Sequence, residues 1–343
     1  MSQTVSARMP TINDVAETAG VSNKTVSNVL NGRHNVRDET KKRVLDAVKE
    51  LGYQPNLVGR QLRYGRSNTI MLAVPELTVP YFAALAHAAL ASAARFGYTM
   101  IITETQGKAE NEIKALQGLR SSFVDGAIVS TLALSGHEAW MKHSDLPVVL
   151  LGERTEDSSI PHVIIDNRQS AIDATTHLIQ QGCKHIAFLG ASRKEQYGTG
   201  WMRMLGYRDA LELNRYEFDE RYVIPTGNYD RENGRAAVQA LIDSCLPFDG
   251  LVCGNDMVAI GAMKQLHDMG FDVPRDVLVI GWDGSLEGEY YNPSLTTIAM
   301  DLPKLANQAV VSVIAMIENR GSIASSMMVD YKLIARESTT RVV

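Results

Sequence analysis

The sequence lacks the segments that would place the protein in a membrane or outside the cell. No run of about 18 apolar residues occurs, so no membrane-spanning helix is predicted. The N-terminal segment MSQTVSARMPTIND contains no apolar core of the kind that a signal peptide requires. We therefore expect a cytoplasmic protein with no membrane partner.

Cysteine is scarce as well. Cys183, Cys245 and Cys253 are odd in number and widely spaced, so they form neither a disulfide framework nor a C-x-x-C metal pair. Each has apolar neighbours and is expected to pack as a small hydrophobic residue. The sequence predicts no metal site and no cofactor.

The common catalytic motifs are also missing. A dinucleotide-binding enzyme needs G-x-G-x-x-G between a strand and a helix. The nearest match, Gly198-Thr199-Gly200, has Arg203 at the last glycine position, where the side chain would prevent close backbone approach. No Walker loop, H-E-x-x-H or G-x-S-x-G motif occurs. We therefore expect no enzymatic activity.

Charge is distributed unevenly along the chain. Residues 1–66 contain 11 Lys/Arg and 6 Asp/Glu, a net charge of +5, and the remaining 23 basic and 33 acidic residues give −10. A basic N-terminal segment on an acidic body fits a protein that meets phosphate with one end only. Ordinary variation among solvated surface charges would also produce a difference of this size.

Residues 11–31 are patterned as two short helices around a tight corner. The apolar residues of the first helix repeat at helical spacing and are Ile12, Val15, Ala16 and Ala19. Gly20 ends this helix because glycine adopts a left-handed turn without a Cβ penalty. Ser22 is a good N-cap for a second helix over 23–30.

The second helix turns Val26, Val29 and Leu30 inward, which leaves its polar N-terminal residues facing outward. Amide and ammonium groups can read base edges in the DNA major groove, while hydroxyls and a helix N-terminus can hold phosphate. The predicted DNA contacts here are Thr11, Ser22, Asn23, Lys24, Thr25, Ser27, Asn28 and Asn31. A helical hairpin with a solvated polar face would show the same local pattern.

A third helix is predicted over 36–52, and its inward stripe consists of Val44, Leu45, Val48 and Leu51. Together the three helices resemble the DNA-binding headpiece of the LacI/GalR family of bacterial transcription regulators. The motifs that carry the resemblance are Asp14-Val15-Ala16, Ala19-Gly20-Val21-Ser22, Thr25-Val26-Ser27, Val29-Leu30-Asn31, Leu51-Gly52-Tyr53 and Pro55-Asn56. Residues 67–343 also resemble the sugar-binding-protein-like core of this family, so the resemblance covers nearly the whole chain.

A hinge is predicted between headpiece and core. Pro55 ends the headpiece, and Asn56 can cap a short helix that runs to Leu62. The resemblance implies a hinge helix that inserts Leu62 into the minor groove, with Asn56 and Arg60 as further DNA contacts. Gly59 departs from the alanine usual in the family, which weakens this helix. Leu62 could instead pack on the core as a linker residue.

From residue 69 onward, short apolar strands alternate with amphipathic helices, a pattern typical of parallel sheets covered on both faces. The predicted strands are 69–74, 99–103, 126–130, 148–151, 163–165, 185–189, 222–224, 250–253 and 277–280. The predicted helices include 81–96, 110–121, 203–213, 231–242, 257–269 and 303–319. The run is too long for one sheet of this type, so two lobes are expected.

The predicted fold is thus a small all-α helix-turn-helix headpiece (1–54), a hinge helix (55–66) and an α/β core of two parallel-sheet lobes (67–343). The resemblance implies a periplasmic-binding-protein-like core with three crossovers, which we place near 166–168, 296–299 and 325–330. It assigns 67–166 and 299–325 to lobe 1, and it assigns 167–298 and 326–343, with a strand over 328–334, to lobe 2.

Ligands of open parallel sheets bind at the carboxyl ends of the strands. The polar and aromatic residues just past the predicted strands are therefore candidate effector contacts: Tyr81, Phe82, Asp166, Thr199, Arg203, Tyr229, Asn255 and Asp283. Carboxylates and arginine can grip hydroxyl pairs, and aromatic rings can lie on the apolar faces of sugars. The resemblance places effector contacts at Phe82, Arg203, Tyr229, Asn255 and Asp283.

Each of these candidates also has a structural alternative. Arg203 could pair with a surface acid, and Phe82 and Tyr229 could pack in the core. Asp256 is expected to cap the helix that begins at Met257 rather than to bind ligand.

The resemblance implies a sequence-specific transcription regulator, a repressor in particular, that binds a pseudo-palindromic operator as a homodimer under the control of a small-molecule effector. A carbohydrate effector is predicted, with a purine or another metabolite as the alternative. A sugar-binding transport receptor would share the core, but it would lack the headpiece and need an export signal. Because no C-terminal leucine-heptad extension is evident, we expect a dimer rather than a tetramer.

Overall fold

The computed structural model describes residues 10–30, 36–53, 66–118, 124–134, 146–152, 160–190, 198–320 and 324–341. The chain divides into two units, Met1–Ser67 and Asn68–Val343. Within the described ranges, none of the helices is long and apolar enough to span a bilayer. The predicted DNA contacts Asn31, Asn56, Arg60 and Leu62 lie outside the described residues.

The described residues of the first unit form three helices, α1 (Ile12–Ala19), α2 (Asn23–Leu30) and α3 (Asp38–Leu51). Its buried core consists of Val15, Ala16, Ala19, Val26, Val29, Val44 and Ala47. Gly20 ends α1 in the left-handed conformation with φ 62°, as predicted. The prediction for Leu45 was wrong: it is 46% exposed, because Ala47 rather than Leu45 continues the inward stripe from Val44.

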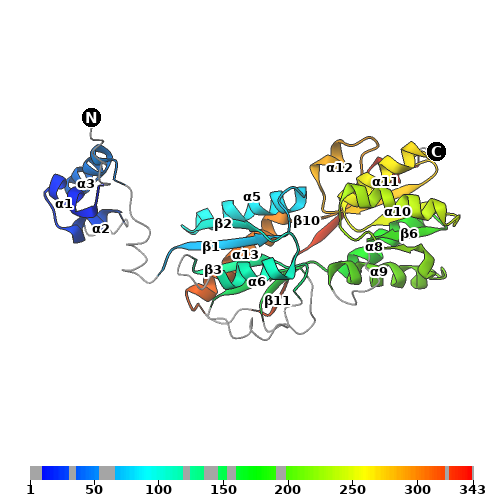
Figure 1. The fold of residues 1–343 in the computed structure, drawn as a ribbon, viewed down its shortest axis with the longest axis horizontal. Coiled ribbons are helices and arrows are strands. Elements are labelled where there is room, and N and C mark those ends of the chain that lie inside the picture. The colour runs from blue at the N-terminus through cyan, green and yellow to red at the C-terminus, as the bar shows by residue number, and fades with distance from the viewer. Residues whose placement is uncertain are drawn as a thin grey trace, which may run out of the picture. The chain divides into compact units, whose positions relative to one another are not determined.

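Lobe 1 of the second unit is built on a six-stranded, all-parallel sheet with the order β11-β5-β4-β3-β1-β2. Its strands are β1 (Thr69–Val74), β2 (Thr99–Glu104), β3 (Gly126–Ser130), β4 (Val148–Leu151), β5 (His162–Ile164) and β11 (Ser326–Met328). Helices α5 (Pro80–Arg95) and α13 (Leu302–Ile317) cover one face, and α6 (Ala109–Gly118) covers the other (Figure 1). Alternate residues of β1 face the two helical layers.

Lobe 2 repeats this architecture with the strand order β12-β10-β9-β8-β6-β7, in which only β12 is antiparallel to its neighbour. Its strands are β6 (Ile186–Leu189), β7 (Val223–Ile224), β8 (Gly250–Cys253), β9 (Leu278–Trp282), β10 (Thr296–Met300) and β12 (Tyr331–Ile334). Helices α8 (Asn167–Gln180) and α9 (Thr199–Leu213) pack on one face, and α10 (Arg231–Asp243) and α11 (Asp256–Asp268) pack on the other.

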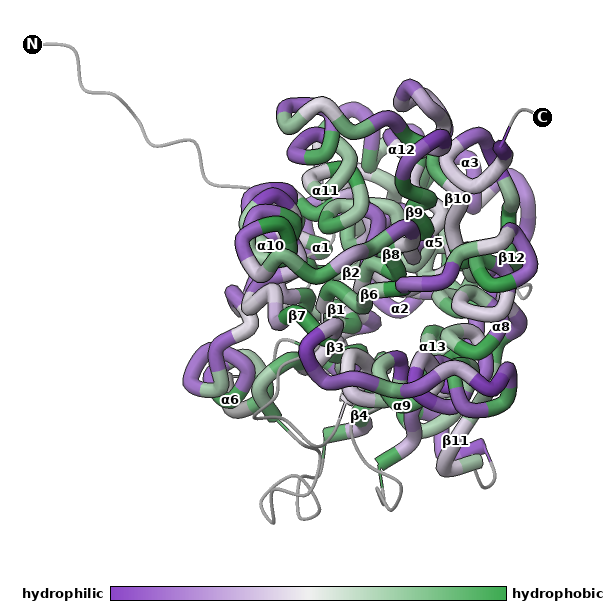
Figure 2. Tube along the Cα trace, turned by 90° about the vertical axis from the view of Figure 1, so that its right-hand side faces the viewer, coloured by the Kyte–Doolittle hydropathy of each residue, from purple (hydrophilic) through white to green (hydrophobic). Residues whose placement is uncertain are grey.

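The buried strands of lobe 2 are hydrophobic along most of their length, as Figure 2 shows for β8 and β9. Among the described residues, three short helices complete this lobe: α12 (Leu286–Tyr290), η1 (Glu220–Tyr222) and η2 (Glu337–Thr339). Cys183 and Cys253 are buried as predicted, but Cys245 is exposed, because it follows the end of α10 in a turn with φ 57°.

Three connections join the lobes: between β5 and α8, between β10 and α13, and between β11 and β12. Two predicted boundaries need correction. The predicted strand 328–334 is two strands, and β11 belongs to lobe 1, where Ser326 pairs with His162. The chain crosses at 329–330, where the backbone N–H of Val329 still donates to Ile164 in lobe 1. In addition, β10 continues in lobe 2 to Met300, beyond the predicted boundary at 298.

Candidate functional site

The headpiece presents the N-terminal end of α2. Ser22 caps this helix as predicted, since its hydroxyl accepts from the backbone N–H of Thr25 at 3.2 Å. Ser22, Asn23 and Lys24 are exposed, and Thr25, Ser27 and Asn28 are half-buried. The exposed N-terminus of this helix therefore combines an ammonium, an amide and the backbone N–H groups of a first helical turn, which is the chemistry that phosphates and base edges require.

Two predicted DNA contacts also have local structural roles. Thr11 forms a capping box with Asp14: its hydroxyl donates to the Asp14 carboxylate at 2.7 Å, and its backbone N–H donates to the same group at 2.6 Å. Asn23 Nδ2 donates to Asn13 Oδ1 at 2.5 Å, which ties α2 to α1. Asn13 was not among the predicted contacts, although its polar side chain on the exposed side of α1 was the available signal.

The core contains a cavity of about 650 Å³ between the two lobes. This volume lies within the range of small-molecule sites. All but one of the predicted effector contacts line it: Tyr81, Phe82, Thr199, Arg203, Tyr229, Asn255 and Asp283. The first two come from lobe 1 and the others from lobe 2, so the cavity lies where the carboxyl ends of both sheets face each other.

Arg203 on α9 is a buried part of this cavity wall, with 6% of its surface exposed. Its Nε donates to Asn167 Oδ1 at 2.9 Å, and its Nη1 donates to the carbonyl oxygen of Gly254. The guanidinium carbon lies 4.8 Å from the centre of the Trp282 ring, a cation–π distance. The proposed surface ion pair is therefore wrong, because Arg203 joins α8, α9 and the end of β8.

Asp166 is the candidate that does not line the cavity. Its carboxylate caps α8 by accepting from the backbone N–H of Gln169 at 2.8 Å. The next residue, Asn167, is buried and lines the cavity instead. The prediction was displaced by one position, because a capping carboxylate turns back over the first turn of its own helix.

The capping role predicted for Asp256 was also wrong by one residue. Asn255 caps α11, since its Oδ1 accepts from the backbone N–H of Val258 at 2.8 Å. Asp256 is fully buried and accepts from the Thr297 hydroxyl and the Ser285 backbone N–H, both at 2.7 Å. This carboxylate therefore holds the turn after β9, which carries Asp283, against β10.

Asp283 stands at this turn in an unusual conformation, with φ 107°. Burial, and secondarily the nearby Asp256 carboxylate, raise the pKa of its carboxyl well above the ordinary value, while Arg203 opposes the shift. Positive φ is uncommon for residues other than glycine and is often found at functional positions. Burial and a nearby carboxylate thus favour a neutral, proton-carrying Asp283 that could donate a hydrogen bond to a ligand.

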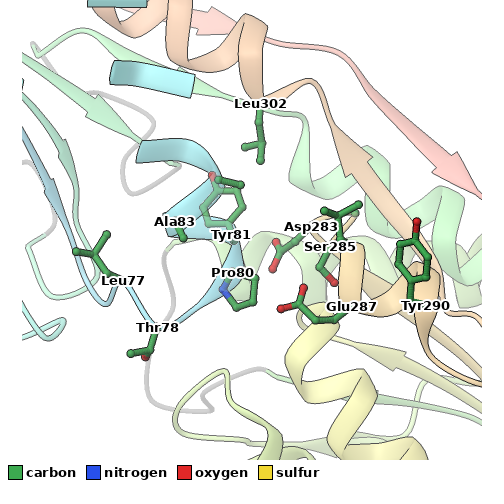
Figure 3. A pocket seen from close by; sticks show the side chains of 13 residues that line it. Leu77, Thr78, Pro80, Tyr81, Ala83, Asp283, Ser285, Glu287, Tyr290 and Leu302 are labelled. Carbon is green, nitrogen blue, oxygen red and sulfur yellow. The ribbon is translucent and has the colours of Figure 1, made fainter. Parts of the chain in front are cut away.

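A second cavity of about 730 Å³ shares Tyr81 and Asp283 with the first. Figure 3 shows these two side chains beside each other, Tyr81 from the start of α5 and Asp283 from lobe 2, with Leu77, Glu287 and Tyr290 around the cavity. Burial, and secondarily Asp283, raise the pKa of the Tyr81 hydroxyl. The pair therefore forms part of the wall between the two cavities.

The lobe 1 side of the first cavity includes the loop after β3, where Thr131, Leu132 and Ala133 are lining residues. Glu112 on α6 is fully buried, and its carboxylate accepts from the backbone N–H groups of Leu132, Ala133 and Leu134 at 2.7, 3.1 and 2.8 Å. Glu112 was not predicted as part of the site, because nothing in the local sequence distinguishes it from the other acids of α6.

Known proteins resemble this chain over nearly its full length. Residues 11–56 match the family model for bacterial regulatory proteins of the lacI family, and residues 175–339 match a periplasmic binding protein-like domain. The HTH-type transcriptional regulator RegA of Clostridium saccharobutylicum is 32% identical over 329 residues, 96% of this chain and 98% of that protein. The ribose operon repressor of Halalkalibacterium halodurans is 34% identical over 331 residues, 96% and 97% of the two chains.

Among solved structures, the complex of the transcriptional regulator CelR with cellobiose has the same fold. It superposes with a TM-score of 0.72 at 26% identity, over 96% of this chain and 99% of that one. The similarity therefore extends over both the headpiece and the two-lobed core.

Proposed function

Because the chain belongs to the lacI family of bacterial regulatory proteins, we propose that it is a transcriptional repressor whose operator affinity depends on a small effector bound between its lobes. The observation that carries this proposal is that one chain combines the exposed polar end of α2 with a polar interlobe cavity. Effector binding and operator binding are then reciprocally linked through the arrangement of the lobes. In this proposal the protein acts on operator DNA in the cytoplasm and has no catalytic role of its own.

In the headpiece, Lys24 and Asn28 are the proposed base contacts, with Ser22, Thr25 and Ser27 on phosphates. Asn23, whose Nδ2 donates a hydrogen bond to Asn13, orients α2, and its side-chain oxygen is proposed as a further base contact. Asn31 and the hinge residues Asn56, Arg60 and Leu62 are proposed as further contacts, with Leu62 as the minor-groove wedge.

A carbohydrate is the proposed effector class. The wall from lobe 2 offers a carboxyl group, an arginine and amides, and Tyr81, Phe82 and Tyr229 contribute rings. This combination suits a polyhydroxyl ligand with apolar ring faces. One relative is named for a ribose operon, and the solved relative holds cellobiose, which supports a sugar. A nucleoside, which also contains a ribose, is the second candidate.

A homodimer is proposed because a pseudo-palindromic operator requires two headpieces. Leu286 and Tyr290 on α12 are 71% and 83% exposed beside the second cavity. Such apolar exposure is typical of an interface, and we assign it to a second copy of the chain. Light scattering of Tyr290→Glu should then show a smaller species than the natural protein, whereas an unchanged mass would place the interface elsewhere.

Operator recognition is tested by selection of DNA from a randomised duplex pool with the full-length protein. We expect a pseudo-palindromic site to be enriched. Lys24→Ala should weaken binding to that site by about 1–3 kcal/mol, with a smaller effect on random DNA. Lys49→Ala, an exposed lysine near the end of α3, is the charge-matched control. Selection of no preferred sequence would contradict the proposed function.

The effector is sought by thermal shift with D-ribose, cellobiose and adenosine. A ligand at one hundred times its Kd should stabilise the protein by about 2.7 kcal/mol. Stabilisation by adenosine but by neither sugar would replace the carbohydrate with a nucleoside.

A further inference from the structure

Tyr229 is seated against three glycines that belong to three different elements of lobe 2. Gly190 follows β6, Gly200 lies in the first turn of α9, and Gly254 follows β8. A Cβ added at Gly254 would lie 2.3 Å from Tyr229 Cε1, and one at Gly200 would lie 2.4 Å from Tyr229 Oη. A Cβ at Gly190 would lie 3.3 Å from Tyr229 Cε1. The tyrosine thus occupies the space that three absent side chains leave.

Hydrogen bonds hold Tyr229 in this seat at both ends. Its hydroxyl donates to the carbonyl oxygen of Gly190 at 2.5 Å, and Asn255 Nδ2 donates to the Tyr229 carbonyl oxygen at 3.1 Å. The backbone N–H of Gly254 donates to the carbonyl oxygen of Leu189 at 2.6 Å. The ends of β6 and β8 and the beginning of α9 therefore meet around a single side chain.

This seat is directly connected to Arg203. The Gly254 carbonyl oxygen, which accepts from Arg203 Nη1, belongs to the same residue that packs against the Tyr229 ring. Arg203 itself follows Gly200 by one turn of α9. A displacement of Tyr229 would therefore move both an acceptor of the guanidinium and the helix that carries it.

We propose that Tyr229 is a positioning residue of the effector site: its seat among Gly190, Gly200 and Gly254 determines where the Arg203 guanidinium stands in the cavity. The inference rests on the proposed function only in naming that cavity the effector site. This role differs from stacking of the Tyr229 ring on a ligand. The Tyr229 hydroxyl donates to Gly190, and the ring packs against Gly254 and Gly190 in the protein without any ligand. Ligand-contacting groups need such support to remain in a productive geometry.

The seat is tested without any ligand by combining Gly200→Ala with Tyr229→Phe. In the natural background, Gly200→Ala should lower the unfolding midpoint by about 2–4 °C, because the new Cβ meets Oη. With Tyr229→Phe the nearest remaining atoms are the Gly190 carbonyl oxygen at 3.4 Å and the ring atom Cζ at 3.6 Å, both at ordinary van der Waals distance. The same alanine should then raise the midpoint, since alanine is the better helix former. Gly288→Ala on α12, where the new Cβ meets Leu295 and Ser285 instead, should act equally in both backgrounds.

The positioning role is read from the Arg203 Nε–H resonance of the full-length ¹⁵N-arginine-labelled protein, identified by its loss in Arg203→Lys. The signal should shift or broaden in Gly200→Ala and return in the double variant, while Gly288→Ala leaves it unchanged. If Gly200→Ala does not fold, Tyr229→Leu and Tyr229→Phe replace it, and only the leucine variant should displace the signal.

If Gly200→Ala changed the unfolding midpoint equally in both backgrounds, the proposed packing of Tyr229 against Gly200 would be wrong. An unmoved Arg203 signal in a destabilised Gly200→Ala or Tyr229→Leu variant would leave Tyr229 a structural residue only. Neither result depends on an effector or on DNA, so the proposed function would stand or fall separately.

Discussion

The two walls of the interlobe cavity are built in different ways. On the lobe 2 side, the polar groups bind one another: Arg203 bonds to Asn167 and Gly254, and Asn255 bonds to Tyr229. On the lobe 1 side, three backbone N–H groups in the described part of the loop after β3 share one acceptor, the carboxylate of Glu112. When one member of a network is removed, the hydrogen bonds among the other members remain. When the Glu112 carboxylate is removed, all three of its hydrogen bonds to the loop are lost together. The wall from lobe 1 should therefore be the more vulnerable to one substitution.

Glu112→Ala should have the largest effect on stability. It leaves three backbone N–H groups without their acceptor, and a buried unsatisfied donor costs about 1–3 kcal/mol. Leu132 is 45% exposed, so water can reach part of this loop. We therefore expect a loss of about 2–5 kcal/mol in total, measured by urea unfolding. Glu110→Ala, an exposed acid on the same helix, is the control, and equal effects of the two would remove the distinction between the walls.

Arg203→Ala should destabilise the core by a smaller amount, about 2–3 kcal/mol, because two buried acceptors lose a charged donor. The network predicts non-additivity: Asn167→Ala should cost less in the Arg203→Ala background, with a coupling of about 0.5–3 kcal/mol. Additive effects in this double-mutant cycle would show that the wall from lobe 2 is not a network.

Much of the fold was predictable because its signals are local. Strands β1, β3, β4 and β8 were predicted with the bounds observed, since each is a short apolar run between polar segments. The division between β11 and β12 was not predicted, because the pairing of Ser326 with His162 depends on residues far away in the sequence.

The sequence was sufficient to predict which residues line the site, but not which of them form hydrogen bonds with one another. Strand ends indicated which residues would gather at the cavity, yet Asp166 and Asp256 were each misjudged by one position. At a helix N-terminus, adjacent polar residues point in different directions, and only the backbone conformation decides which one caps. Glu112 was missed because its partners are backbone groups, which carry no sequence signature.

Phe82→Ala tests how much the wall from lobe 1 contributes to effector binding. Its ring lies edge-on to Tyr81 with centroids 5.0 Å apart at 72°, and such pairs contribute about 0.5–1.5 kcal/mol. We expect a stability loss of about 1 kcal/mol and a roughly tenfold loss of effector affinity, measured by calorimetry with the ligand found by thermal shift. Phe82→Tyr, which keeps the ring, is the control. Unchanged affinity in Phe82→Ala would leave ligand contact on the lobe 1 side to the loop after β3.

The smallest expected effect is on the pH dependence of the protein's stability, through Asp283 in the wall from lobe 2. Because burial and Asp256 raise the pKa of the Asp283 carboxyl, the native protein retains a proton that the unfolded chain releases near its ordinary pKa of about 3.9. The native state then binds more protons than the unfolded state, so stability falls as the pH rises above about 4. Asp283→Asn removes this titration and should flatten the decline.

Asparagine suits the position because it tolerates the positive φ of Asp283, so the backbone of the turn should persist. Its amide also donates a hydrogen bond, as a protonated carboxyl does. Asp283→Asn should therefore retain effector binding at neutral pH, whereas Asp283→Ala should lose it while the stability slope flattens equally. Asp256, whose pKa burial also raises, leaves a residual slope in both variants. Unfolding curves between pH 4 and 8 decide the matter: if the slope of Asp283→Asn equals that of the natural protein, Asp283 is ionised in the native state. The wall from lobe 2 would then present a carboxylate beside Arg203, and the neutral donor would have to be sought elsewhere in the cavity.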